Sequence, residues 1–206
     1  MKKFYKFFGL SLIIAVLYLG FTTYPKLDLI SGFSAKSIAS GHFIDGRSQE
    51  MIEKGDNDIK LIDLAKNTIN ESGKFAVASV YGLKERKAIY REGLGATLIT
   101  SDFDVNKPYE VPRRTKLSNN LPFPYGNLEP KDTVFNNIDY TKLNAAVANA
   151  FDKKGEINKR TRSVLVIYKD KIIAEKYDTG FTKESKILGW SMTKSITATM
   201  FKKKKK

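Results

Sequence analysis

The chain of 206 residues contains no cysteine and a single histidine. Without cysteine it can form no disulfide, no cysteine-ligated zinc site, no cysteine nucleophile and no lipidated N-terminal cysteine. The one imidazole, His42, lies in a polar stretch flanked by glycines, so a Ser-His-Asp catalytic arrangement is not predicted. Any attachment to a membrane must therefore come from the polypeptide itself.

Acidic residues are fewer than basic ones, and the formal net charge is +14. Eight of the positive charges lie at the two ends of the chain, on Lys2, Lys3, Lys6 and residues 202–206. The long middle section keeps only a mild excess, whereas a nucleic-acid-binding protein carries its basic residues as a patch on the folded body. Nucleic acid is not predicted as a partner. The 42% of hydrophobic and 28% of charged residues are typical of a globular protein.

Charged residues are absent from residues 7–25, and the stretch is almost entirely apolar. As a helix rising ~1.5 Å per residue, it covers about the ~30 Å hydrocarbon layer of a bilayer. Lysines on its N-terminal side favour a cytoplasmic N-terminus and an exported body. The prediction is one anchor in a bacterial-type inner membrane, with the body on the periplasmic or extracellular side. The alternatives are a cleaved signal peptide, although no small-x-small cleavage site follows closely, and a buried helix of a soluble protein.

Composition divides the chain into four segments. Five of the six prolines fall between Pro108 and Pro130, which makes this stretch the best candidate for a linker or a proline-rich loop. The predicted segments are an anchor or signal at 1–26, an N-terminal extension at 27–107, the proline-rich linker or loop at 108–135 and a second folded region at 136–206.

The N-terminal extension shows weak secondary-structure signals. Residues 27–55 are polar and rich in glycine, so an irregular stretch is predicted. Residues 56–70 carry isoleucines at roughly helical spacing, which predicts a short amphipathic helix. Residues 75–81 and 87–90 are rich in strand formers on either side of a turn, which predicts a β-hairpin.

The second region has stronger patterns. Leu143, Val147 and Phe151 recur every four residues, which predicts an amphipathic helix over 139–151 with Asn137 or Asp139 as its cap. Continuous apolar runs at 163–168 and 172–177 predict two antiparallel strands. A loop then enters a helix that begins at or beside Ser191. The stripe predicted to be buried on this helix is Met192, Ile196 and Met200.

The candidate site is the motif Ser191-Met-Thr-Lys194. A serine hydroxyl is a weak nucleophile that needs a base beside it. Residues three apart share one face of a helix, so the Lys194 amine can reach the Ser191 hydroxyl. The amine must be neutral to accept a proton, which requires burial or neighbouring cations. The N-terminus of the helix would also stabilise negative charge on the reacting oxygen.

The sequence from Arg162 to Tyr177, followed by Gly189-Trp-Ser-Met-Thr-Lys-Ser195, resembles the serine β-lactamase and penicillin-binding superfamily. The nearest similarity is to its class C-like branch of esterases and amide hydrolases. Residues 81–98 are similar to the N-terminal extension of membrane-attached members. The resemblance implies an acyl-serine mechanism on an amide or ester, with Ser191 as nucleophile and Lys194 as base. It implies no cofactor and leaves the substrate unspecified.

The resemblance also implies what this chain lacks. The family has a Tyr-x-Asn motif and a Lys-Thr-Gly or His-x-Gly strand after the serine, whereas here Phe201 runs into five lysines. The expectation is an α+β chain: a membrane helix, a small α/β extension and the incomplete start of a β-lactamase-like domain, with helices packed on an antiparallel sheet. Such a fragment is expected to be inactive. The lysines are interpreted as adenine-rich sequence translated after a frame disruption, with a sequencing artefact or an added tail as alternatives.

Three other groups of residues are weaker candidates. Tyr125-Gly-Asn127 matches Tyr-x-Asn but precedes the serine, and it is interpreted as coincidence. Ser195 is expected to lie a turn inside the helix and to bond there. Acidic residues that could suggest a metal site are interpreted as a solvated loop, namely Asp102, Asp104 and Glu110.

Two functions outside catalysis stay open. The first is a non-enzymatic envelope protein, anchored by residues 7–25, whose N-terminal region binds a partner. The second is a polybasic tail that acts on anionic lipid. The anchor weakens the second possibility, because it places the tail on the exported side of the membrane.

Overall fold

The computed structural model describes residues 2–113, 120–123, 125–126, 128–130, 133–153 and 158–204. The chain forms two compact units, Met1–Arg113 and Arg114–Lys206, and the boundary lies in the proline-rich stretch. The fold is mixed α+β, with a long N-terminal helix and antiparallel sheets. The finer segment limits and the β-lactamase-like architecture of the second region stay predictions.

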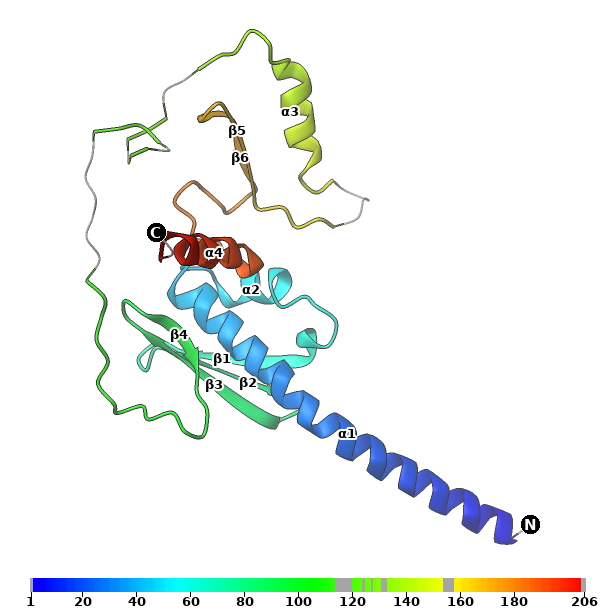
Figure 1. The fold of residues 1–206 in the computed structure, drawn as a ribbon. Helices are drawn as coiled ribbons and strands as arrows, with labels where there is room; N and C mark the ends of the chain where they lie inside the picture. Colours follow the sequence, from blue (N-terminus) through cyan, green and yellow to red (C-terminus); the bar gives the residue numbers. More distant parts are fainter. Residues whose placement is uncertain are drawn as a thin grey trace. The chain divides into compact units, whose positions relative to one another are not determined.

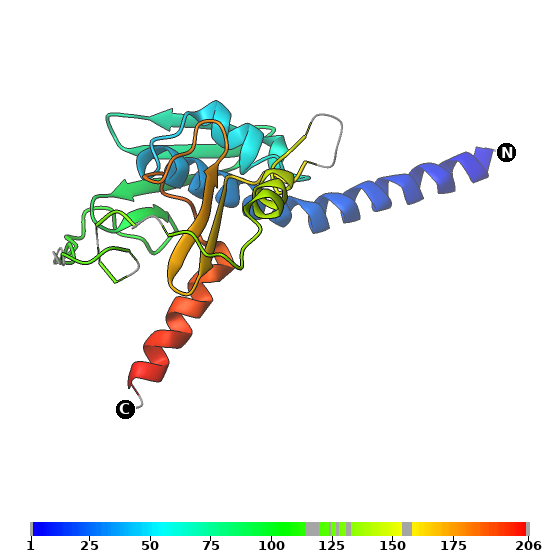
Figure 2. The ribbon, with the colours of Figure 1, turned by 90° about the horizontal axis from the view of Figure 1, so that it is seen from above.

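The first unit is built on α1 (Lys2–Phe43), one continuous helix. Leu17 and Phe21 in its N-terminal half are 67% and 83% exposed, whereas Ile38 in its C-terminal half is fully buried. The C-terminal half lies across a sheet and the N-terminal half projects beyond it (Figures 1 and 2). Gly9–Phe43 is long and apolar enough to cross a membrane, judged by length and composition.

The prediction of an irregular stretch over residues 27–55 is wrong. Helix α1 continues to Phe43, and α2 (Gln49–Gly55) follows after a short turn. Gly32 and Gly41, which indicated loops, provide close packing instead, whereas Gly46 does lie between the two helices, with a φ angle of 71°. A Cβ atom at Gly41 would lie 2.7 Å from the Cδ1 atom of Ile52, so only glycine lets α1 and α2 approach this closely.

Four strands form an antiparallel meander in the order β1-β2-β3-β4. They are β1 (Ala65–Asn70), β2 (Phe75–Val80), β3 (Leu83–Arg91) and β4 (Gly95–Leu98). The core between this sheet, α1 and α2 consists of small and branched residues, namely Ala35, Ile38, Ala39, Ile52, Ala76, Ala78, Ala88 and Ala96. Alanine on both the helix and the sheet brings the two layers close together, so the core is thin and densely packed.

The predicted helix over residues 56–70 is also wrong. A single 3-10 turn, η1 (Ile62–Leu64), leads directly into β1. Ile69 packs against the core from β1, and the strand pairs along its whole length with β2. Pairing with a strand distant in the fold prevails over the local spacing of isoleucines. The predicted hairpin is confirmed, but its turn is shorter than predicted: only Tyr81 and Gly82 join β2 and β3, and residues 83–86 belong to β3.

A buried ion cluster joins the ends of α1 and α2. The Arg47 guanidinium lies 3.0 Å from a carboxylate oxygen of Asp45 and 2.6 Å from one of Asp56. All three side chains are less than a tenth exposed. Removing Arg47 would take the guanidinium away from two buried carboxylates, so the cluster holds the connection in one geometry.

The second unit confirms the predicted helix and hairpin. Helix α3 (Tyr140–Asn149) is capped by Asp139, whose side chain accepts a hydrogen bond from the Lys142 N–H at 3.0 Å. Strands β5 (Ser163–Tyr168) and β6 (Lys171–Tyr177) pair antiparallel through a two-residue turn. Their side chains alternate between half-buried and exposed along β5, rather than being covered on both faces.

Replacement of Ile52 tests the packing of the first unit. Ile52 is fully buried, so Ile52→Ala should lower the free energy of unfolding of this unit by about 2–5 kcal/mol. Met51, its neighbour on α2, is 41% exposed, and Met51→Ala should change it by about 0.5 kcal/mol or less. Hydrogen exchange of the slowest β2 and β3 amides in the detergent-solubilised protein measures both. Equal losses in the two variants would contradict the packing.

The Asp139 cap makes the stability of α3 depend on pH. The Lys142 N–H, and then the Lys142 side chain, hold the pKa of the Asp139 carboxyl below its usual value. Stability from this cap is therefore present above the pKa of the unfolded chain and lost as the pH falls through the lower folded value. Hydrogen-exchange protection of α3 should drop below about pH 4 in the wild type. In Asp139→Asn, which keeps a capping oxygen without a titrating group, the profile should be flat.

Candidate functional site

Ser191 and Lys194 meet as predicted. Helical structure begins with the 3-10 turn η2 (Trp190–Met192), one residue before the serine, and continues as α4 (Thr193–Lys204). The Lys194 Nζ atom donates a hydrogen bond to the Ser191 Oγ atom at 3.1 Å. The pair therefore has the contact that proton transfer from a serine to a lysine requires.

The turn that carries Ser191 is tight and strained. The Met192 N–H donates to the Gly189 carbonyl at 2.8 Å, and the Thr193 hydroxyl donates to the Trp190 carbonyl at 2.7 Å. Trp190 has a φ angle of 42°, in the left-handed region that a bulky residue rarely adopts. Such a conformation costs about 1–3 kcal/mol. Backbone strain therefore lies directly before the candidate nucleophile.

The stripe predicted to be buried beside this pair is exposed. Met192, Ile196 and Met200 are 69%, 64% and 69% accessible. Ser191 and Lys194 are exposed as well. The prediction of burial fails because helical spacing shows only that apolar side chains share a face. Whether that face is covered depends on another layer, and the described residues of this unit do not cover it.

The weaker candidates lie in local contacts. His42 belongs to the first unit, where its ring nitrogens contact the Arg47 carbonyl at 3.0 Å and the Glu71 carboxylate at 2.7 Å. The Ser195 carbonyl accepts from the Thr199 hydroxyl at 2.9 Å, inside α4. Both arrangements are structural contacts within their own units.

Tyr125 donates from its hydroxyl to the Asp170 carboxylate at 2.7 Å, and this bond raises the pKa of the phenol. Asn127, its partner in the Tyr-x-Asn match, lies outside the described residues. In the acidic loop, Asp104 accepts from the backbone N–H of Asn106 at 2.9 Å. Across the described parts of the chain, no three acidic, histidine or cysteine side chains gather as a metal site would require.

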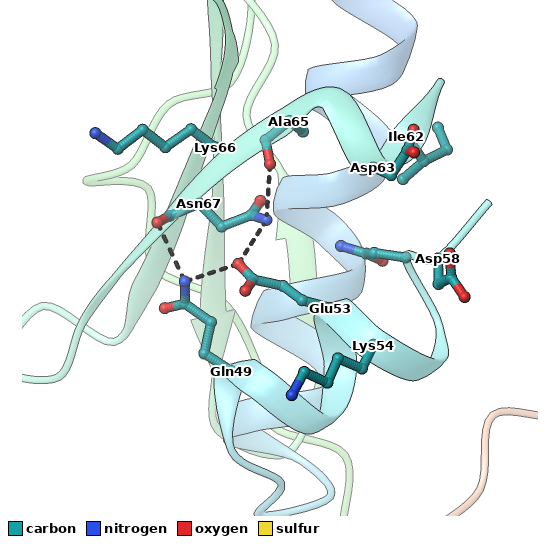
Figure 3. A pocket seen from close by; sticks show the side chains of 10 residues that line it. Gln49, Glu53, Lys54, Asp58, Ile62, Asp63, Ala65, Lys66 and Asn67 are labelled. Carbon is teal, nitrogen blue, oxygen red and sulfur yellow. Dashed lines mark hydrogen bonds between the residues drawn. The ribbon is translucent and has the colours of Figure 1, made fainter. Parts of the chain in front are cut away.

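A polar pocket in the first unit was not predicted. It lies between α2 and β1 and has a volume of about 570 Å³ (Figure 3). Glu53 accepts hydrogen bonds from the side-chain amides of Gln49 at 2.8 Å and Asn67 at 3.0 Å. Asn67 also accepts from Ser34 of α1 at 2.6 Å. Hydrogen bonds thus join residues of α2 and β1 that line the pocket, and Asn67 connects them to α1.

One signal in the sequence could have indicated part of this network. Ser31, Ser34, Ser37 and Ser40 recur every three residues, and all four are buried where α1 crosses the sheet. A repeat of small polar residues at this spacing is compatible with one face of a helix packed closely on a neighbour. The asparagine partners on the sheet carry no comparable periodic pattern.

Comparison with protein-family models, with curated proteins and with solved structures finds no match to this chain. Proposals about its function therefore depend on the contacts within its two units and on the resemblance of the Ser191 motif to that of the serine β-lactamase and penicillin-binding superfamily.

Proposed function

We propose that Ser191 and Lys194 are the nucleophile and base of an acyl-serine hydrolase site for amides or esters, of the β-lactamase-like type. We further propose that this 206-residue chain is by itself nearly inactive. The observation that carries the proposal is the 3.1 Å hydrogen bond between Lys194 Nζ and Ser191 Oγ at the start of a helix. The strained turn at Trp190 and the preceding β5–β6 hairpin support it.

The chemistry follows from this contact. The Ser191 oxygen attacks the substrate carbonyl carbon while its proton passes to the Lys194 amine. The tetrahedral intermediate then expels the alcohol or amine, which takes the proton from Lys194, and an acyl ester remains on Ser191. Water, deprotonated in the same way, cleaves that ester and restores the serine. The partial positive charge at the N-terminus of the helix would stabilise the developing oxyanion.

Low activity follows from exposure. Neutral lysine amines in proteins owe that state to burial or to neighbouring cations, and the Lys194 side chain is not buried. An exposed site also leaves the oxyanion in water, where donors contribute less than in a dry cavity. Loss of one preorganised oxyanion donor alone costs ~100–1,000-fold in rate. A buried setting for α4 would be needed for efficient turnover.

The proposed location is the exported face of a membrane. The uncharged residues 7–25 lie in the N-terminal part of α1, where residues 10–21 are exposed, and Lys2, Lys3 and Lys6 precede them. This charge distribution favours a cytoplasmic N-terminus, with both folded units on the other side and α1 retained as an anchor.

Chemical labelling tests the assignment of Ser191. The full-length protein would be treated with a fluorophosphonate, and modification of each serine followed by mass spectrometry. Slow modification is expected, faster at Ser191 than at Ser195, one turn away on the same helix. Lys194→Met should reduce the rate at Ser191 to that of Ser195, because the base is removed while the chain length is kept.

Two outcomes would contradict the proposal in different ways. Equal rates at the two serines, unchanged in Lys194→Met, would show that the pair has no nucleophilic function. Rapid stoichiometric labelling that disappears in Ser191→Ala would show that the exposed site is already efficient, and the proposed inactivity would be wrong.

Extraction of membranes tests the anchor. Alkaline carbonate should leave the full-length protein in the membrane pellet, since a spanning helix of this length is held by its apolar surface. A variant with Leu12, Val16 and Leu19 replaced by aspartate should be released, because charges near the centre of the bilayer are costly. Release of the unaltered protein, or a shorter mature chain that lacks residues 1–26, would exclude a retained anchor.

A second candidate function is binding of a partner by the first unit. It is favoured by one observation: Met1–Arg113 encloses a core of its own and presents the polar pocket of Figure 3. The protein would then be a non-enzymatic envelope component, and its function would be independent of Ser191.

A further inference from the structure

The turn between β2 and β3 exposes apolar surface at one end of the sheet. Tyr81 is 76% exposed and Leu83 is 46% exposed. The φ angles of Tyr81 and Gly82 are 54° and 74°, the combination that a two-residue hairpin turn requires. The backbone therefore presents these side chains at the end of a rigid hairpin.

This turn is held against α1 at the point where the helix leaves the sheet. The Ser31 hydroxyl donates to the Lys84 carbonyl at 2.5 Å, and the Lys84 ammonium lies 4.5 Å from the centre of the Tyr24 ring. Arg86, two residues further along β3, pairs with Asp28 at 2.5 Å. Three contacts thus fix the hairpin beside residues 24–31 of the helix (Figure 1).

On the N-terminal side of residues 24–31, α1 is apolar and exposed. Phe21 is 83% exposed and Leu19 is 60% exposed. Tyr24 is three residues after Phe21, a rise of about 4.5 Å along the axis. Lys84, which contacts Tyr24, is the second residue of β3, the strand that follows the turn directly. If residues 7–25 cross the bilayer, the turn must therefore lie near the level of the lipid headgroups.

The residue types in and beside the turn are suited to the headgroup layer of a bilayer. Tyrosine concentrates at membrane interfaces because its ring is apolar and its hydroxyl is polar. Lysine can extend its ammonium toward headgroups while its stem lies on apolar surface. The polar backbone of the turn stays hydrated in the headgroup layer, which the hydrocarbon core would not allow.

We infer that the β2–β3 turn is a second membrane contact, in which Tyr81 and Leu83 insert into the interface of the bilayer that α1 spans. The partner is the lipid surface itself. Two points of contact, the helix and the hairpin, fix how the first unit is oriented on the membrane. The inference goes beyond the proposed catalytic function and rests on α1 being a membrane span.

Tryptophan fluorescence in vesicles tests this contact. The full-length chain with Trp190→Phe would carry one tryptophan, introduced as Tyr81→Trp or as Leu83→Trp. The matched control is Leu94→Trp, at 42% exposure in the β3–β4 turn, which lies at the opposite end of β3. The vesicles are phosphatidylcholine and phosphatidylglycerol, with bromine on the upper acyl chain as the quencher, and acrylamide probes access from water.

We expect bromolipid to quench the emission of Tyr81→Trp and Leu83→Trp to roughly half, and that of Leu94→Trp by roughly a tenth at most, as the interfacial placement requires. Acrylamide should show the reverse order. Flotation of the same vesicle samples shows independently whether the protein is bound to the membrane through α1. Chains that float, but whose tryptophans at the turn are quenched no more than the control, would overturn the inference and leave the anchor intact. Chains that fail to float would overturn both.

Discussion

The first unit depends on the burial of the C-terminal half of α1 against the sheet. Ala35, Ile38 and Ala39 on the helix meet the alanines of β2 and β3, and most of the buried side chains between the two layers are small. Such close approach maximises dispersion contacts, and it makes the arrangement sensitive to any added volume. The same helix, α1, continues beyond this core as an exposed apolar N-terminal half. One continuous helix therefore carries both part of the core of this unit and a segment long and apolar enough to cross a membrane.

Several polar groups at the edge of this core pair with one another. Arg47 lies between Asp45 and Asp56, and the amide of Asn67 bridges α1 to α2 through Ser34 and Glu53. Buried polar atoms destabilise a fold unless they are bonded, so each such bond restricts how the helices can sit. The polar pocket of this unit is a consequence of the same network. A binding surface here would be rigid without any ligand.

In the second unit, the geometry of the Ser191–Lys194 pair and its chemical reactivity have different requirements. A helix brings residues three apart into contact whatever surrounds it, so the Ser191–Lys194 hydrogen bond forms on an exposed helix. The reactivity of the pair depends on removing water from the lysine and on donors placed around an oxyanion, and both require further layers of structure. The exposed pair thus has the contact that the proposed site requires, but not the buried surroundings.

The sequence by itself determined the features that depend on neighbours along the chain. These are the apolar N-terminal helix, the two β-hairpins, α3 with its cap at Asp139, and the contact of Ser191 with Lys194. Tertiary structure decided the rest, because the deciding partners are distant in sequence. Packing on the sheet extended α1 through glycines that indicated loops, pairing with β2 made a strand of residues around Ile69, and the lack of a covering layer among the described residues left Met192 and Ile196 exposed. Local patterns specify which atoms can meet, whereas burial is a property of the layers that assemble around them.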